Sequence, residues 1–242
     1  MAEVPGALNF RDVGGLPAVG GATRHGVLFR SGNLARVKDD GREALRALGV
    51  RSIVDLREDA EVAYEPTALG DLPITLQRVP LFAGSLASFF ESDVTLDELY
   101  RSLIEASGAS LVDVVRHVIT GPPVLVHCTV GKDRTGVVVA LTLAAAGVEE
   151  EAILADYART EASLPAERNE RVLAYLRRMH PESRNLADLA TRSPAPVMKG
   201  LLDELREQYG APVEFLRHQG LHDDELRELR RVLIVPGGDS TF

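Results

Sequence analysis

The chain has 242 residues, a formal net charge of −9 and a single cysteine, Cys128. Its length can bury the core of one sizeable domain, and 45% hydrophobic with 26% charged residues is ordinary for a soluble globular protein. The acidic balance excludes a nucleic-acid-coating role, so an anionic ligand has to be attracted by a local positive site. One thiol cannot form an internal disulfide, so the fold does not depend on an oxidising compartment. No apolar stretch approaches the roughly 20 residues of a membrane span. The first residues show no classical secretory signal. We therefore expect a cytoplasmic protein.

The first half of the chain is predicted to alternate strands with helices. The expected strands are GVLFRSG (26–32), RSIVDLRE (51–58) and ITLQRVPLF (74–82). DDGREALRALG, between the first two strands, predicts a helix that ends at Gly49. Helical spacing returns over 95–120 and indicates a break where a serine and a glycine interrupt it, at 107–108.

The second half predicts one buried strand and then helices. VLVH (124–127) follows two prolines and is too short and β-branched for a helix, whereas TGVVVALTLAAAG (135–147) reads as an apolar helix. From about residue 150 onward the spacing is almost wholly helical, through DDELRELRRVLI at 223–234. Strands first, helices later and alternation between them predict an α/β domain with a helical C-terminal third.

The most informative segment is HCTVGKDRTG (127–136), which joins this strand to this helix. Unpaired N–H groups and the dipole at a helix N-terminus form an anion site suited to phosphate. Gly131 lets several N–H groups converge, and Arg134 adds a bidentate guanidinium. The same field favours the thiolate of Cys128, a candidate nucleophile for attack on phosphorus, with Asp133 placed to protonate the leaving oxygen. A buried core thiol is the alternative, but it leaves the neighbouring charges unexplained.

This segment resembles the Cys-x5-Arg phosphate loop of the protein tyrosine and dual-specificity phosphatases, in the form found in a bacterial and fungal branch that includes a mycobacterial enzyme. The resemblance implies a tyrosine-phosphatase-like α/β fold: a central mixed sheet flanked by helices, with a helical C-terminal third that could form a lid. It implies one phosphatase domain over 1–242, with 160–210 as the candidate lid, and a phosphomonoester hydrolase that uses neither metal nor cofactor. Further segments resemble that branch in the same order: NFRDVGG (9–15), LFRSGNL (28–34), IVDLRE (53–58), ILADYARTE (153–161) and QYGAPVEFLRHQGL (208–221).

The resemblance also implies roles for individual residues. Cys128 is expected to form a phosphocysteine intermediate, Arg134 to bind the phosphoryl oxygens, and Asp133 to act as the general acid. Lys132 resembles a lysine of lipid-directed phosphatases, and Thr135 is expected to donate a hydrogen bond to the thiolate. The expected phosphate-binding residues are Thr129, Val130, Gly131, Lys132, Arg134 and Thr135.

Five more residues are candidates for supporting the site. His127 is expected to orient the loop rather than to transfer protons. Arg11 and Asp12 could line the site, although a buried pair that locks the N-terminal segment is favoured. Asp55 ends a strand, where α/β proteins place ligands, but a turn-stabilising pair with the arginine two residues later is at least as good an interpretation. Arg101 could reach the phosphate pocket or simply be solvated.

The substrate is left open by these residues. Phosphotyrosine, phosphoserine or phosphothreonine proteins, phosphoinositides and small metabolite phosphates all suit the loop, and oxyanions such as phosphate or vanadate should bind there. The stretch EDAEVAYEP (58–66) is acidic and lacks the substrate-binding arginines of the mycobacterial relative, which leaves Asp133 as the obvious acid. His218 and His222 have a zinc-like spacing but no third ligand in view, so no metal is expected.

Two functions from other classes compete with the phosphatase. A rhodanese-like sulfur transferase also places a cysteine in an anion-binding loop, and a non-catalytic phospho-ligand binding module could share the fold. The adjacent Asp133 and Arg134 are not needed for sulfur transfer, and an intact Cys128 is not needed for binding alone. The sequence therefore favours the phosphatase over both.

Overall fold

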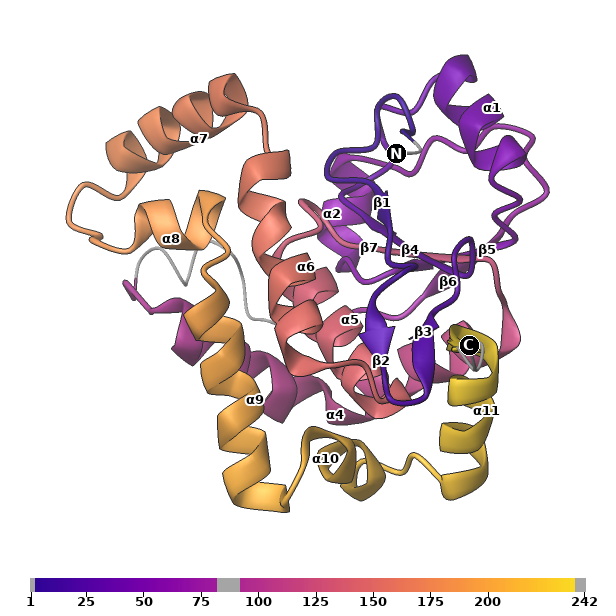
Figure 1. Cartoon of the computed structure of the whole chain (residues 1–242). Coiled ribbons are helices and arrows are strands. Elements are labelled where there is room, and N and C mark those ends of the chain that lie inside the picture. Colours follow the sequence, from indigo (N-terminus) through magenta and orange to yellow (C-terminus); the bar gives the residue numbers. More distant parts are fainter. Residues whose placement is uncertain (1–2, 82–91, 238–242) are drawn as a thin grey trace.

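The computed structural model of the chain describes residues 3–81 and 92–237 (Figure 1). Its centre is a five-stranded mixed sheet in the order β1-β4-β7-β5-β6, in which β1 is antiparallel to β4 and the other neighbours are parallel. Helices flank this sheet, which confirms the predicted fold class. The strands are β1 (Arg11–Asp12), β4 (Leu28–Ser31), β5 (Ser52–Asp55), β6 (Thr75–Arg78) and β7 (Val124–His127).

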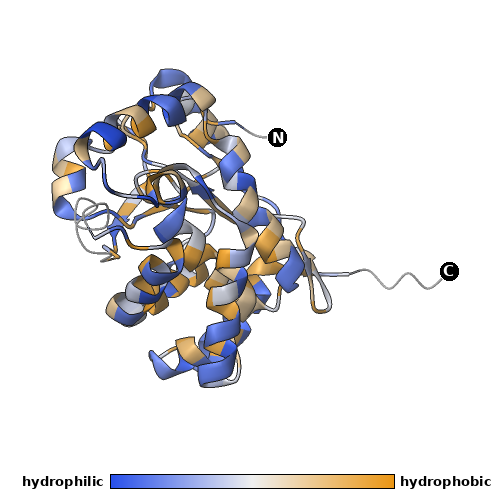
Figure 2. Ribbon diagram, turned by 90° about the vertical axis from the view of Figure 1, so that its left-hand side faces the viewer, coloured by the Kyte–Doolittle hydropathy of each residue, from blue (hydrophilic) through white to orange (hydrophobic). Residues whose placement is uncertain are grey.

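The core forms on both faces of the sheet because alternate residues of a strand point to opposite sides. Phe29, Ile53 and Leu125 pack with α1 (Asp39–Ala47), which ends just before a left-handed Gly49, as predicted. Four hydrophobic residues next to them in the strands belong to a larger cluster on the other face: Leu28, Val54, Val124 and Val126. Hydrophobic residues gather on the inner sides of the helices there (Figure 2).

The larger face is covered by a layer of helices. The predicted break appears as a kink at Ser107, where φ is −125° within one long helix. The helix that follows the phosphate loop is buried along nearly its whole length, which explains its apolar sequence. The helices of this layer are α4 (Leu96–Thr120), α5 (Asp133–Ala146), α6 (Glu150–Ser163), α9 (Ala195–Tyr209), α10 (Pro212–His218) and α11 (Asp223–Leu233).

Two further helices extend from the body of the molecule, at the upper left of Figure 1. They are α7 (Ala166–Met179) and α8 (Leu186–Thr191), and both lie inside the segment predicted as a lid. A small separate cluster around Leu176 and Leu186 holds them against each other.

The sequence missed the shortest elements. A second sheet joins β2 (Pro17–Ala18), β3 (Gly21–Thr23) and β8 (Ile234–Pro236). The helical prediction through residue 234 was therefore wrong at its end, because this residue pairs with β3 instead. The predicted strand over 74–82 is four residues long, and its residue 82 lies outside the described part of the chain. Within residues 3–81 and 92–237 no helix is both long and apolar enough to cross a membrane.

Candidate active site

The predicted phosphate loop joins β7 to the first turn of α5. Gly131 has a φ of +74°, and a Cβ at this position would lie 2.3 Å from the Ser31 carbonyl oxygen, so both conformation and space require glycine. The Gly131 N–H donates to Cys128 Sγ at 3.3 Å. Cys128 is buried, and this amide donor is suited to stabilising negative charge on its sulfur.

The outer side of the loop is fixed by two distant side chains. The Gly131 carbonyl oxygen accepts from Asn9 Nδ2 at 2.9 Å and from Arg30 Nη2 at 3.0 Å. Because a trans peptide holds its C=O and N–H on opposite sides, these bonds turn the Lys132 N–H the other way. The Lys132 N–H is thus directed toward the inner side of the loop.

A buried ionic network holds Arg30 in place. Asp156 on α6 accepts from Arg30 Nη1 at 2.7 Å and from Arg11 Nε at 2.7 Å, and all three residues are almost fully buried. Burial alone would raise the pKa of Asp156, but the two guanidinium groups outweigh it and lower that pKa. Burial and the charge of Arg30 lower the pKa of Arg11 to about 10. The network ties the N-terminal segment to the underside of the phosphate loop.

The suggested pairing of Arg11 with Asp12 is therefore not found. Arg11 locks the N-terminal segment, as favoured, but through Asp156, whereas Asp12 accepts from the Gly14 N–H at 2.8 Å and the Gly26 N–H at 2.9 Å. Neighbouring residues of a strand point to opposite faces, so these two side chains cannot share one site.

Arg134 is held by a carboxylate that the sequence did not single out. Its Nη1 donates to Glu61 Oε2 at 2.6 Å and its Nη2 to Glu61 Oε1 at 2.7 Å, while Thr129 Oγ1 bonds to the same carboxylate. Burial would raise the pKa of Glu61, but the hydrogen bonds and charge of Arg134 outweigh it and lower the pKa to about 2. The guanidinium is therefore oriented by an ion pair with α2 (Asp59–Tyr64).

A second unforeseen group surrounds Asp133. Its Oδ1 accepts from Lys132 Nζ at 2.6 Å and from the Tyr100 hydroxyl at 2.9 Å. The Tyr100 oxygen lies 2.6 Å from the Tyr157 oxygen, and burial, the largest effect, together with the charge of Asp133 raises the pKa of both phenols. Lys132 is 1% exposed, so its ammonium faces Asp133 rather than solvent. Both bonds fall on the same carboxyl oxygen, Oδ1.

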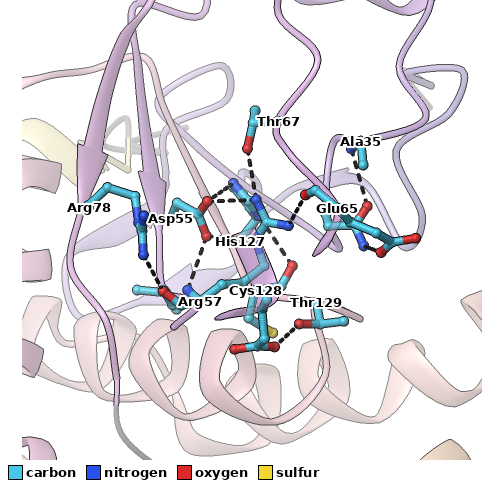
Figure 3. A network of polar contacts seen from close by, with 12 residues as sticks. Ala35, Asp55, Arg57, Glu65, Thr67, Arg78, His127, Cys128 and Thr129 are labelled. Carbon is cyan, nitrogen blue, oxygen red and sulfur yellow. Dashed lines mark hydrogen bonds and ion pairs between the residues drawn. The ribbon is translucent and has the colours of Figure 1, made fainter. Parts of the chain in front are cut away.

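The start of the loop adjoins a polar network at the carboxyl ends of β5 and β7, drawn in Figure 3, in which Asp55, Arg57 and His127 are fully buried. Arg57 Nη2 donates to Asp55 Oδ2 at 2.8 Å and to Thr67 Oγ1 at 2.8 Å, which is the turn-stabilising pair. His127 Nε2 lies 3.8 Å from Asp55 Oδ2, and burial, only partly offset by Asp55, lowers the pKa of the imidazole. The lowered pKa favours the neutral imidazole, whose Nδ1 lies 3.2 Å from the Cys128 carbonyl oxygen.

The remaining predicted residues divide between the site and the surface. Val130 lies in the loop, and the buried Thr135 Oγ1 has no hydrogen-bond partner among the described residues. Arg101 is directed away to Glu204 at 2.9 Å, so it does not reach the loop. His218 and His222 belong to different elements, the end of α10 and the N-cap of α11. In the described chain, no group of three His, Cys, Asp or Glu side chains is placed to hold a metal ion.

The chain is similar to known proteins along nearly its whole length. A family model described as the tyrosine phosphatase family matches residues 2–235. The triple specificity protein phosphatase PtpB of Mycobacterium tuberculosis is 32% identical over 278 aligned residues, which cover 97% of this chain and 99% of the relative. A tyrosine-protein phosphatase of Nostoc commune is 31% identical, over 83% of this chain and 72% of its own length. Among solved structures, the catalytic core of the S. cerevisiae PP-IP phosphatase Siw14 gives a TM-score of 0.43 at 16% identity, covering 78% of this chain and 94% of that one.

Proposed function

The chain belongs to the tyrosine phosphatase family, as its loop predicted, and we propose that it hydrolyses phosphotyrosine and related phosphomonoesters through a phosphocysteine intermediate at Cys128. The observation that carries this proposal is the loop itself. The Gly131 N–H is bonded to Cys128 Sγ in a backbone conformation fixed from outside, at the N-terminus of a buried helix. Such a loop holds its backbone N–H donors in position to stabilise a thiolate and a bound phosphate anion.

In the first step the Cys128 sulfur attacks phosphorus. The S–P bond forms as the P–O bond to the leaving group breaks, and the electron pair of that bond stays on the leaving oxygen. Asp133 Oδ2 supplies the proton, since Oδ1 is held by Lys132 and Tyr100. The product of this step is phosphocysteine and a free alcohol or phenol.

In the second step water cleaves the phosphocysteine. Asp133, now ionised, takes a proton from the water while the water oxygen bonds to phosphorus. The S–P bond breaks, which releases inorganic phosphate and regenerates the thiolate. The loop amides and Arg134 stabilise the equatorial oxygens in both steps. The buried Thr135 hydroxyl has no hydrogen-bond partner within residues 3–81 and 92–237, and it is suited to donate to the thiolate as it leaves.

Other features extend the same proposal. We infer one phosphatase domain over 1–242, in line with the family match to 2–235, with α7 and α8 as a lid over the substrate. Phosphate and vanadate should compete with substrate in the loop, because both present a tetrahedral oxyanion. The cytoplasm is the proposed compartment, where a sole thiol nucleophile is kept reduced.

The test is phosphate release by the wild type and by C128S, without added metal. The panel holds a phosphotyrosine peptide, a phosphoserine peptide, a soluble phosphoinositide and several sugar and nucleotide phosphates at matched concentrations. We expect turnover that is highest on phosphotyrosine, is lost in C128S and is inhibited by vanadate. Undiminished turnover in C128S would overturn the mechanism. No release from any substrate by folded wild type would favour a binding module or, if thiocyanate forms from cyanide, sulfur transfer.

A further inference from the structure

A cavity of about 620 Å³ adjoins the phosphate loop, where Thr129 and Val130 line it. Residues 6–8 and the beginning of α7 line it as well. Thr129 also accepts from Arg134 Nη2 at 3.2 Å, so the cavity begins one side chain away from the phosphate-binding guanidinium. A group bound there would be part of the same substrate as the phosphate.

Three arginines from two separate segments reach this cavity. Arg36 follows β4, whereas Arg168 and Arg171 lie one turn apart on α7. Two glutamates also line it, but Glu65 is already engaged, since it accepts from Asn33 Nδ2 at 2.7 Å and lies 3.8 Å from Arg36. The lining is thus cationic within a chain whose net charge is −9.

Arg168 is the most buried of these cations, since Arg36 and Arg171 are exposed. It is half-buried, its Nη1 donates to the neutral Asn169 Oδ1 at 3.0 Å, and within residues 3–81 and 92–237 no carboxylate lies within ion-pair distance of it. Burial and the charge of Arg36 lower the pKa of Arg168, and no acidic group offsets them. An anion in the cavity would relieve both the desolvation and the repulsion.

We propose that this cavity is a second anion subsite, in which Arg168, with Arg36 and Arg171, binds an acidic residue next to the phosphotyrosine of a peptide substrate. The inference rests on the proposed function and adds a substrate class to it. Arginine suits this role because its planar fork can accept a carboxylate with two parallel hydrogen bonds.

The lining favours a peptide over a lipid headgroup. Leu8, Pro165 and Val172 give the cavity an apolar surface that side chains of a peptide can contact, and Glu167 would repel a densely charged polyphosphate. The overall charge of −9 also opposes approach to an anionic membrane.

The experiment uses a series of phosphotyrosine peptides that each carry one glutamate, placed at a different position from three residues before to three residues after the phosphotyrosine. A peptide with alanine at all of these positions is the reference, and kcat/KM is measured for each peptide. The readout is the ratio of kcat/KM for the best glutamate peptide to that for the reference. Wild type should give a ratio of about fivefold to thirtyfold, the value of one charge-assisted contact, and the ratio should fall at high salt. R168A should bring it close to one, R168K should retain part of it, and R36A, at an exposed position, should lower it less.

R177A is the matched control, because Arg177 is an exposed arginine of the same helix outside the cavity. It should keep the wild-type ratio. A wild-type ratio of one, or an equal loss of turnover on both peptides in folded R168A, would overturn the subsite while leaving the phosphatase intact. A larger Arg168-dependent preference for a short-chain phosphoinositide bisphosphate over the monophosphate would overturn the peptide assignment. Absence of turnover on every substrate would instead count against the proposed function.

Discussion

Replacing Glu61 with glutamine tests whether one carboxylate holds Arg134, the proposed phosphate-binding arginine, in place. The Glu61 carboxylate accepts hydrogen bonds from both terminal nitrogens of Arg134, at 2.6 and 2.7 Å, and the arginine is only 7% exposed. Burial opposes ionisation of Glu61, yet Arg134 lowers its pKa from 4.5 to about 2. At about 1.4 kcal/mol per pH unit, this shift corresponds to roughly 3 kcal/mol of stability at neutral pH.

The sign of the pH dependence follows from this direction. A carboxylate whose pKa is lower in the folded state stabilises the fold fully above its unfolded value of 4.5, and this contribution is lost as pH falls towards about 2. E61Q should therefore be less stable than wild type by about 2–3 kcal/mol at pH 7, and the difference should shrink between pH 5 and pH 3. Urea unfolding at these pH values measures it.

The matched control is E43Q, which removes an exposed carboxylate from an i,i+3 pair with Arg46 and should change stability by less than about 0.5 kcal/mol. In activity assays, E61Q should raise the inhibition constant of inorganic phosphate about tenfold, because the guanidinium loses its fixed orientation. An E61Q protein with wild-type stability at pH 7, or with a pH-independent deficit, would refute the reasoning. A stability loss with unchanged phosphate inhibition would show that the pair does not serve the site.

Three further substitutions test other parts of the loop. D133N should lower kcat on phosphotyrosine peptides by about 10²–10⁴-fold, measured beside p-nitrophenyl phosphate, whose good leaving group needs little protonation and should show a smaller loss. Y100F removes one of the two bonds to Asp133 Oδ1 and should lower kcat about tenfold with KM held, whereas a change confined to KM would contradict a role in placing the acid. G131A places a Cβ 2.3 Å from the Ser31 carbonyl oxygen. We therefore expect this variant to lose vanadate binding, measured by calorimetry, and to have a lower melting temperature. Wild-type values of both would show that the loop does not need the φ of +74° at this position.

The loop itself could be predicted because its information is local. Cys128 and Arg134 lie six residues apart, and the strand before them and the helix after them have clear apolar patterns. The break in α4 was equally readable, since a Ser-Gly pair interrupts the helical spacing. Short strands such as β2 and β3 were not, because two or three residues carry no periodicity from which a strand can be recognised.

The residues that support the loop could not be found in this way because their partners are far apart in the chain. Arg30 and Asn9 contact Gly131 from 101 and 122 residues away. Tyr100 reaches Asp133 across 33 residues, from a helix whose sequence indicates only that this position is buried. Each contact depends on how β4, α4 and the loop come together in the fold, which local spacing does not specify.

Glu61 shows what physical reasoning could have added. A phosphate-binding arginine in a buried loop keeps its charge when no substrate is present, and an uncompensated buried guanidinium is strongly destabilising. A carboxylate partner is therefore required by Arg134 itself, even though 36 acidic residues are available in the chain. The acidic stretch at 58–66, interpreted as lacking substrate-binding cations, begins three residues after the end of β5, which is parallel to β7, and so lies at the same edge of the sheet as the loop. Within it, Asp59 pairs with Arg78. Glu61 supplies the counter-charge of Arg134, because it faces the loop from the first turn of α2.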